Sequence, residues 1–320
     1  MKHGLTKSYM LNTLLTIGLC AAYCLWGGIL QLAAGLLISA LLGITLYRQY
    51  YGFGILNALL IVVIFSLFAG VLAAVTAGVP LILLGLALAL GTRFKMNFNG
   101  LLVVCAFVYI ANVLLGFVVL DRITGESVKF TAILMEMGEN LQATFAAEYQ
   151  DPAVKEAISR ALTEAVNLSV MLSPAIFMIL SLAQAYLLLI VYKKLQMKNG
   201  VDMSFLSGFD SLRLGREAAI IYLVLFIVLT GLASGLFADA AANVLLVMSF
   251  LYMFVGMSVF ESKMKKNGTS KLTRRLVFIG SVIFSTTLVM LPALVFIITG
   301  LLDSFLDYRK LRGGTEGDAE

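Results

Sequence analysis

The organisation of this chain is decided by residues 121–166, which read DRITGESVKFTAILMEMGENLQATFAAEYQDPAVKEAISRALTEAV. Eight acidic and four basic side chains make this segment net acidic, whereas apolar residues dominate the sequence on both sides of it. This contrast predicts a water-facing insert between two membrane-embedded halves.

The insert is predicted to fold as a helical hairpin. Its apolar residues recur at helical spacing in two stretches, for example at Met137 and Leu141 and then at Ile158 and Leu162. Asp151-Pro152 separates the stretches, and an aspartate followed by proline is a common start of a helix. Two interpretations stay open: a solvated outer hairpin, or a lid over an outward-facing cavity.

The composition places the rest of the chain in a membrane. Of the 320 residues, 61% are hydrophobic and 13% are charged, and the mean hydropathy is +0.99. These values lie far outside the globular range. The apolar runs are continuous rather than alternating, which predicts helices whose backbone groups are hydrogen-bonded within each segment. We expect an all-α protein, a polytopic transmembrane helical bundle of eight or nine spans with an extracytoplasmic amphipathic hairpin.

The apolar runs divide the chain into four parts. Residues 1–120 form an N-terminal membrane half of about five apolar segments, and 121–166 form the hairpin. Residues 167–308 form a C-terminal membrane half of about four segments, and 309–320 form a polar tail. Gly78-Val79-Pro80 predicts a turn of the chain. The fourth apolar piece after it, residues 81–90, is short, so it either spans a locally thinned bilayer or is re-entrant.

The lysine and arginine positions predict an orientation. The formal net charge is +5, and the basic residues gather in short connectors, above all in 193–217 and 261–275. Because cytoplasmic loops carry such an excess, the N-terminus is expected in the cytoplasm and no nucleic-acid partner is needed. If nine segments crossed the membrane, Arg309 would lie on the outer side. That would contradict the rule that basic residues are enriched in cytoplasmic segments. Either the last apolar segment bends back at Pro292, or an earlier segment does not cross.

The span interiors offer no recognisable catalytic chemistry. No ionisable side chain lies near the middle of a span, His3 is the only histidine, and no GxxxxGK[ST] phosphate loop occurs. Cys20 and Cys24 share a helix face without further ligands, which indicates apolar filler rather than a metal site. We expect no enzyme, with no catalytic residue, metal or cofactor, and any ATP-driven work would need a partner.

Uncharged polar residues within the spans are the remaining candidates for binding. Such groups commonly bond across membrane helices and serve packing. The alternative is that Asn57, Asn112 and Gln184 converge on a cavity and hold a small neutral or zwitterionic ligand.

Small residues repeat every fourth position at Gly35, Ser39 and Gly43. Such a face lets helix backbones approach closely. It serves either internal packing, which is the more common use, or the docking of another subunit.

Three short pieces resemble the YybS-like family of bacterial multi-pass membrane proteins, whose function is uncharacterised. They read VYKKL at 191–195, FDSLRLGR at 209–216 and GLLDSFLDYRK at 300–310. The resemblance implies a bacterial plasma membrane location and supplies no catalytic residues. The N-terminal half is also reminiscent of the substrate-capture subunits of energy-coupling-factor transporters, which lack their own ATPase.

Two functional hypotheses follow. The first is a small-molecule binding or transport-associated subunit that depends on a separate energising ATPase module. The second is a non-transporting scaffold or regulator that recruits cytoplasmic partners through its basic loops and C-terminal helix. The candidate docking residues are the small face at Gly35, Ser39 and Gly43, together with Arg213, Arg216, Asp303, Asp307 and Arg309.

Overall fold

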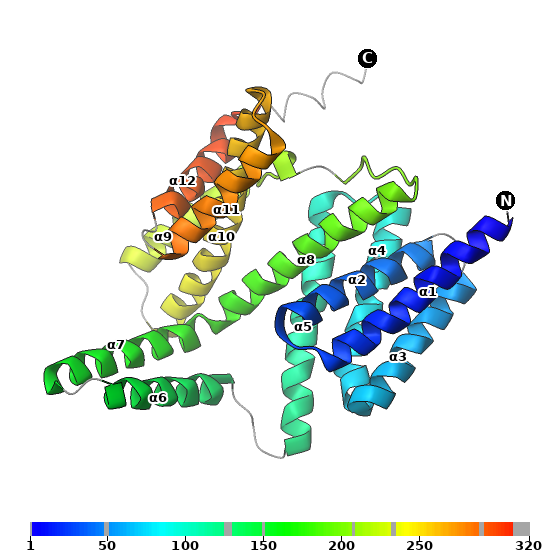
Figure 1. The fold of residues 1–320 in the computed structure, drawn as a ribbon. Helices are drawn as coiled ribbons and strands as arrows, with labels where there is room; N and C mark the ends of the chain where they lie inside the picture. Colours follow the sequence, from blue (N-terminus) through cyan, green and yellow to red (C-terminus); the bar gives the residue numbers. More distant parts are fainter. Residues whose placement is uncertain are drawn as a thin grey trace. The chain divides into compact units, whose positions relative to one another are not determined.

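The fold is entirely helical over the residues that the structure describes. The computed structural model describes residues 2–47, 51–124, 130–148, 151–206, 209–231, 235–287 and 291–309, and no strand occurs in these ranges. The all-α prediction is therefore confirmed. The chain forms two compact units: unit 1 holds residues 1–170 and 177–206, and unit 2 holds 171–176 and 207–320 (Figure 1).

A buried core in unit 1 joins the first four membrane helices and the π-helical turn between the third and the fourth. Cys20, Ile38, Leu42, Ile61 and Phe65 are almost fully buried there. The elements are α1 (Lys2–Leu25), α2 (Gly28–Tyr47), α3 (Tyr51–Ala73), the π-helical turn η1 (Ala74–Gly78), α4 (Val79–Arg93), α5 (Phe98–Thr124), α6 (Phe130–Glu148), α7 (Pro152–Met171) and α8 (Ser173–Lys198).

The chain reverses direction at Gly70 rather than at residues 78–80. Gly70 has φ 86° and ψ 163°, outside the helical region and readily adopted only by glycine. After this reversal Gly78 lies against Ile61 and Phe65. The returning helical run covers residues 71–93, about 34 Å at 1.5 Å per residue. This run is therefore long enough to cross a membrane. The expectation that the fourth apolar segment is short and limited to 81–90 is thus wrong.

Helices α6 and α7 form the predicted hairpin. The Gln142 amide donates to the Ser159 hydroxyl, and Gly138 faces Val166, so the two helices run antiparallel side by side (Figure 1). The amide of Ala153 donates to Asp151 Oδ1 at 2.9 Å, which is the N-cap expected from the sequence.

Unit 2 contains η2 (Phe209–Ser211), α9 (Arg216–Gly231), α10 (Gly235–Lys266), α11 (Lys271–Thr287) and α12 (Leu291–Leu306). It also holds the short connection between α7 and α8. Asn243 on α10 fixes this connection, since its Nδ2 donates to Met171 O at 2.8 Å and its Oδ1 accepts from Ala175 N at 2.9 Å. This polar span residue therefore serves packing.

The last apolar segment is two helices, α11 and α12, with Pro292 as the second residue of α12. This is the first of the two alternatives posed by the position of Arg309. The Arg309 side chain lies beside Asp210 and Leu212, so the end of α12 returns to the end of unit 2 that carries the 209–212 loop. Lys265 of α10 also pairs with Asp210, so the basic C-terminal turn of α10 lies at this same end of the unit.

Five helical runs within the described ranges are long and apolar enough to cross a membrane: 28–47, 53–93, 98–119, 153–198 and 235–266. The run 53–93 contains the reversal at Gly70, and shorter apolar helices cover 10–25 and 291–306. The chain is thus an all-α multi-pass membrane protein.

The units divide the chain differently from the predicted halves. Residues 177–206 were expected with the C-terminal half, but they pack in unit 1. The aromatic pairs Phe117–Phe177 and Phe98–Tyr186, both with ring centroids 5.9 Å apart, join α8 to α5. From Phe177 onward, α8 therefore belongs to the same compact unit as the hairpin.

Candidate functional site

A pocket of about 270 Å³ opens among the membrane helices of unit 1. Side chains of α1, α2, α4, α5 and α8, with one residue of η1, form its wall. The lining residues are Tyr23, Gly28, Gln31, Leu32, Gly35, Leu36, Ala77, Pro80, Leu81, Leu84, Tyr109, Asn112, Val113 and Gln184. We call it the amide pocket, after its three amide side chains.

The polar groups of the amide pocket carry no charge. Gln31, Asn112 and Gln184 supply amides, and Tyr23 and Tyr109 supply phenols. The Gln31 amide interacts with the Tyr23 hydroxyl. Asn112 Oδ1 is buried and has no hydrogen-bond partner among the described residues. An unpaired acceptor in an apolar wall favours a ligand that brings an N–H or O–H donor and no net charge.

The pocket brings together two of the three residues proposed from the sequence. Asn112 and Gln184 line it, whereas Asn57 does not. Asn57 is fully buried on α3, and neither its Nδ2 nor its Oδ1 has a partner within the described part of the chain. Tyr23, Gln31 and Tyr109 were missed, although Gln31 is an amide within an apolar run and carried the same signal as Asn112.

The small-residue face of α2 is used inside unit 1. A Cβ added to Gly43 would lie 3.0 Å from Leu88 Cβ and 3.2 Å from Gly85 O, both on α4. Gly35 faces Tyr23 and Leu81, and Ser39 is fully buried. Gly35 and Gly43 thus serve close packing of α2 against α1 and α4, which is internal packing, the first of the two uses considered for this face.

A chain of hydrogen bonds joins α8 to α4 below the surface. Gln196 Nε2 donates to the Tyr192 hydroxyl at 2.9 Å, and that hydroxyl lies 2.8 Å from Thr92 Oγ1. Thr92 Oγ1 donates to Leu88 O at 2.8 Å, and the Tyr192 hydroxyl lies 3.4 Å from the same carbonyl oxygen. Tyr192 is fully buried, so water does not replace a lost partner.

Tyr192→Phe is expected to lower the free energy of unfolding by about 1–3 kcal/mol, because Gln196 and Thr92 each lose a buried partner. Denaturant unfolding of the detergent-solubilised chain, followed by circular dichroism, measures this change. Tyr308→Phe is the control, since Tyr308 is 53% exposed. Equal stability of the two variants would contradict the role given to the Tyr192 hydroxyl.

Unit 2 encloses an ion pair between Asp303 and Arg309. Arg309 Nη2 and Asp303 Oδ2 lie 2.7 Å apart, and the two side chains are 3% and 4% exposed. Arg309 also donates to Asp210 O at 2.9 Å, to Leu212 O at 2.7 Å and to Ser258 Oγ at 2.7 Å. One guanidinium thereby ties the 209–212 loop, α10 and α12 together.

The residues of this region proposed for docking differ in exposure. Asp303 and Arg309 are buried and pair with each other inside unit 2, so their charges are already balanced. Asp307 is partly exposed and ends α12 with φ 45°. Arg213 and Arg216 are exposed, and Arg216 Nη2 donates to Phe305 O at 3.3 Å. Of the docking residues proposed in this region, Arg213, Arg216 and Asp307 are the ones with exposed or partly exposed side chains.

A family described as "Predicted membrane protein (DUF2232)" matches residues 14–304. The chain belongs to this family. The DUF2232 match runs from α1 into the last turn of α12, so it covers both units. No curated protein and no solved structure matches the chain. Membership of the DUF2232 family and the apolar helices agree that this is a multi-pass integral membrane protein.

Proposed function

We propose that this protein binds a small neutral or zwitterionic molecule in the amide pocket. The observation that carries the proposal is the buried, unpaired Asn112 Oδ1 in a wall that also holds Gln31, Gln184 and two phenols. A few placed polar groups in an apolar pocket are the usual composition of a ligand site, and about 270 Å³ suits a small ligand.

The role in the cell is proposed as that of a transport-associated subunit. Among the described residues, no charged side chain lines the amide pocket, which favours an energy source other than proton transfer through a carboxylate. The sequence has no phosphate-binding loop, which favours a separate ATPase module as the source of energy. The resemblance of the N-terminal half to substrate-capture subunits, which lack their own ATPase, supports the same proposal. We place the protein in a bacterial plasma membrane with a cytoplasmic N-terminus, and propose no catalytic step.

Trp26 provides the readout for a ligand screen. It is the only tryptophan of the chain and stands two residues before Gly28, which lines the amide pocket. A panel of neutral and zwitterionic metabolites is added to the purified protein, and Trp26 emission and thermal unfolding are recorded. Binding is expected to shift both readouts, since a ligand that binds the native state stabilises it. A panel that shifts neither would count against the proposal.

Asn112→Leu is expected to weaken the binding of any compound found in this way by about tenfold or more, because a hydrogen bond to the ligand is lost. Asn57→Leu is the matched control: it replaces a buried span amide that does not line the pocket. Isothermal titration of both variants measures the difference. Wild-type affinity in Asn112→Leu would show that the compound binds elsewhere.

A scaffold or regulator that recruits cytoplasmic proteins is the second candidate, favoured by the exposed Arg213 and Arg216. A mild-detergent pull-down with mass spectrometry separates the two roles. Co-purification of an ATPase pair and a membrane coupling protein supports the transport subunit. A partner that is lost in Arg213→Gln/Arg216→Gln, without any ATPase, supports the scaffold.

A further inference from the structure

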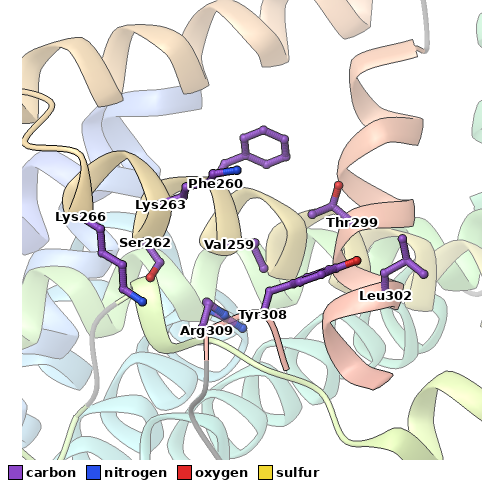
Figure 2. Close-up of a pocket in the computed structure, with 9 residues that line it drawn as sticks. All are labelled: Val259, Phe260, Ser262, Lys263, Lys266, Thr299, Leu302, Tyr308 and Arg309. Atoms are coloured by element: carbon purple, nitrogen blue, oxygen red, sulfur yellow. The ribbon is translucent and has the colours of Figure 1, made fainter. Parts of the chain in front are cut away.

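A second pocket lies in unit 2, where the C-terminal ends of α10 and α12 come together (Figure 2). Its volume is about 420 Å³. Ser262, Lys263 and Lys266 of α10 and Tyr308, which follows α12, supply its polar groups. Phe260 and Leu302 supply apolar wall. We call it the lysine pocket.

The lysine pocket has an excess of positive charge. Lys263 and Lys266 are exposed and form no ion pair with any described residue, whereas their neighbour Lys265 pairs with Asp210 at 2.7 Å. That contact lowers the pKa of Asp210, so its carboxylate stays charged and committed to Lys265. Arg309 on the wall is likewise balanced by Asp303. Lys263 and Lys266 are therefore available to neutralise an anionic ligand.

Hydroxyl groups add donors beside the two lysines. In the described ranges, the hydroxyls of Ser262 and Tyr308 have no hydrogen-bond partner, while Thr299 Oγ1 donates to Val295 O at 2.7 Å. In Figure 2, Ser262 and Lys266 lie on adjacent turns of α10, with Tyr308 between them and α12. Ammonium and hydroxyl donors around one opening match the oxygens of a phosphate group.

An apolar stripe leads away from the pocket along α12. Val295, Ile298 and Leu302 follow one another at helical spacing and are 48%, 47% and 41% exposed. Leu302 belongs to both the stripe and the pocket wall. A soluble anion would leave this stripe unused, whereas a lipid tail would cover it.

We propose that the lysine pocket binds the phosphate-bearing headgroup of an anionic phospholipid. Lys263, Lys266, Ser262 and Tyr308 hold the headgroup, and an acyl chain covers Val295, Ile298 and Leu302. Basic pockets between membrane helices at the cytoplasmic surface bind acidic headgroups in this way, and the lysines stand at the end of α10 that the charge distribution assigns to the cytoplasm. This site is independent of the amide pocket.

The experiment titrates full-length protein in a neutral detergent with short-chain phosphatidylglycerol or phosphatidylcholine, and native mass spectrometry counts the bound lipid. The wild-type protein is expected to bind phosphatidylglycerol more tightly than phosphatidylcholine. Lys263→Gln/Lys266→Gln should lose about fivefold in affinity for each lysine, or about 25-fold in all. Lys263→Arg/Lys266→Arg keeps both charges and should still bind.

The matched control is Lys271→Gln/Arg275→Gln. It removes the same charge from exposed positions of α11 that do not line the pocket. This variant is expected to bind phosphatidylglycerol as wild type does. A third arm adds millimolar inorganic phosphate, which should leave the lipid bound because it cannot occupy the apolar stripe.

Three results would overturn the proposal. Equal affinity of wild type for the two lipids would remove the selectivity for negative charge. Equal losses in the pocket variant and in its control would show a general charge effect. Full displacement of the lipid by inorganic phosphate would assign the pocket to a free anion.

Discussion

Arg309→Met is expected to lower the free energy of unfolding of unit 2 by about 3–5 kcal/mol, because it leaves the Asp303 carboxylate buried without its counter-charge. The Asp303 side chain is 4% exposed and its Oδ1 has no hydrogen-bond partner among the described residues, so no other group replaces the lost guanidinium. The carbonyls of Asp210 and Leu212 lose their donors as well. Denaturant unfolding of the solubilised full chain measures the loss.

Two variants separate this effect from the simple removal of an arginine. Arg275→Met changes an exposed arginine of the same unit and is expected to stay within about 0.5 kcal/mol of wild type. Asp303→Leu/Arg309→Met removes both charges and should recover much of the loss, because an apolar pair replaces a buried ion pair at little cost. If Arg309→Met were as stable as Arg275→Met, the ion pair would not hold the end of α12.

The turns of unit 1 show where sequence reasoning stops. A glycine and a proline at 78–80 predicted a reversal there, yet Pro80 stands near the start of α4 and continues the helical run. Pro80 directly follows the π-helical turn η1, where the Val79 amide donates to Ala74 O, and this irregular turn accommodates a residue that lacks an N–H. The reversal at Gly70 depends on its φ of 86°. Nothing in the surrounding apolar sequence distinguishes this glycine from a glycine that lies within a helix and lets two helices approach closely.

The insert was predictable because its signals are local. Asp151 caps α7 in the way its type and position indicate, and the apolar spacing of α6 and α7 follows from the helical period. The length of residues 276–302, by contrast, fits one span, and the division into α11 and α12 was only one of two alternatives. Pro292 in the first turn of α12 was the available signal.

The candidate pockets depend on information that helical spacing does not contain. Asn57, Asn112 and Gln184 look alike in sequence, but the face of each helix that meets an opening is set by tertiary packing, which left Asn57 in the core. Asp303 and Asp307 are four residues apart, which would put them on one face of a continuous helix. The chain instead leaves the helix at Asp307, with φ 45°, so Arg309 folds back onto Asp303.

Gly256→Ala and Gly300→Ala are each expected to destabilise unit 2 by about 3 kcal/mol, because they overpack the crossing of α10 and α12. A Cβ on Gly256 would lie 1.9 Å from Phe296 O, and one on Gly300 would lie 2.2 Å from Tyr252 O. Both contacts are with backbone atoms, so no rotamer change relieves them and the helices must separate. Thermal and denaturant unfolding of the solubilised protein measure the loss.

Gly280→Ala is the matched control for this crossing. Gly280 lies on α11, and an added Cβ would meet nothing within 4 Å. The substitution is therefore expected to stabilise the helix by about 0.5–1 kcal/mol through the smaller backbone entropy of alanine. Stability changes of opposite sign in Gly256→Ala and Gly280→Ala would establish that the close approach of the helices, rather than glycine content, decides the stability of this crossing.

The double variant Gly256→Ala/Gly300→Ala is expected to lose less stability than the sum of the two single losses, since one separation of the helices relieves both clashes. Additive losses would show that the two glycines act at independent contacts.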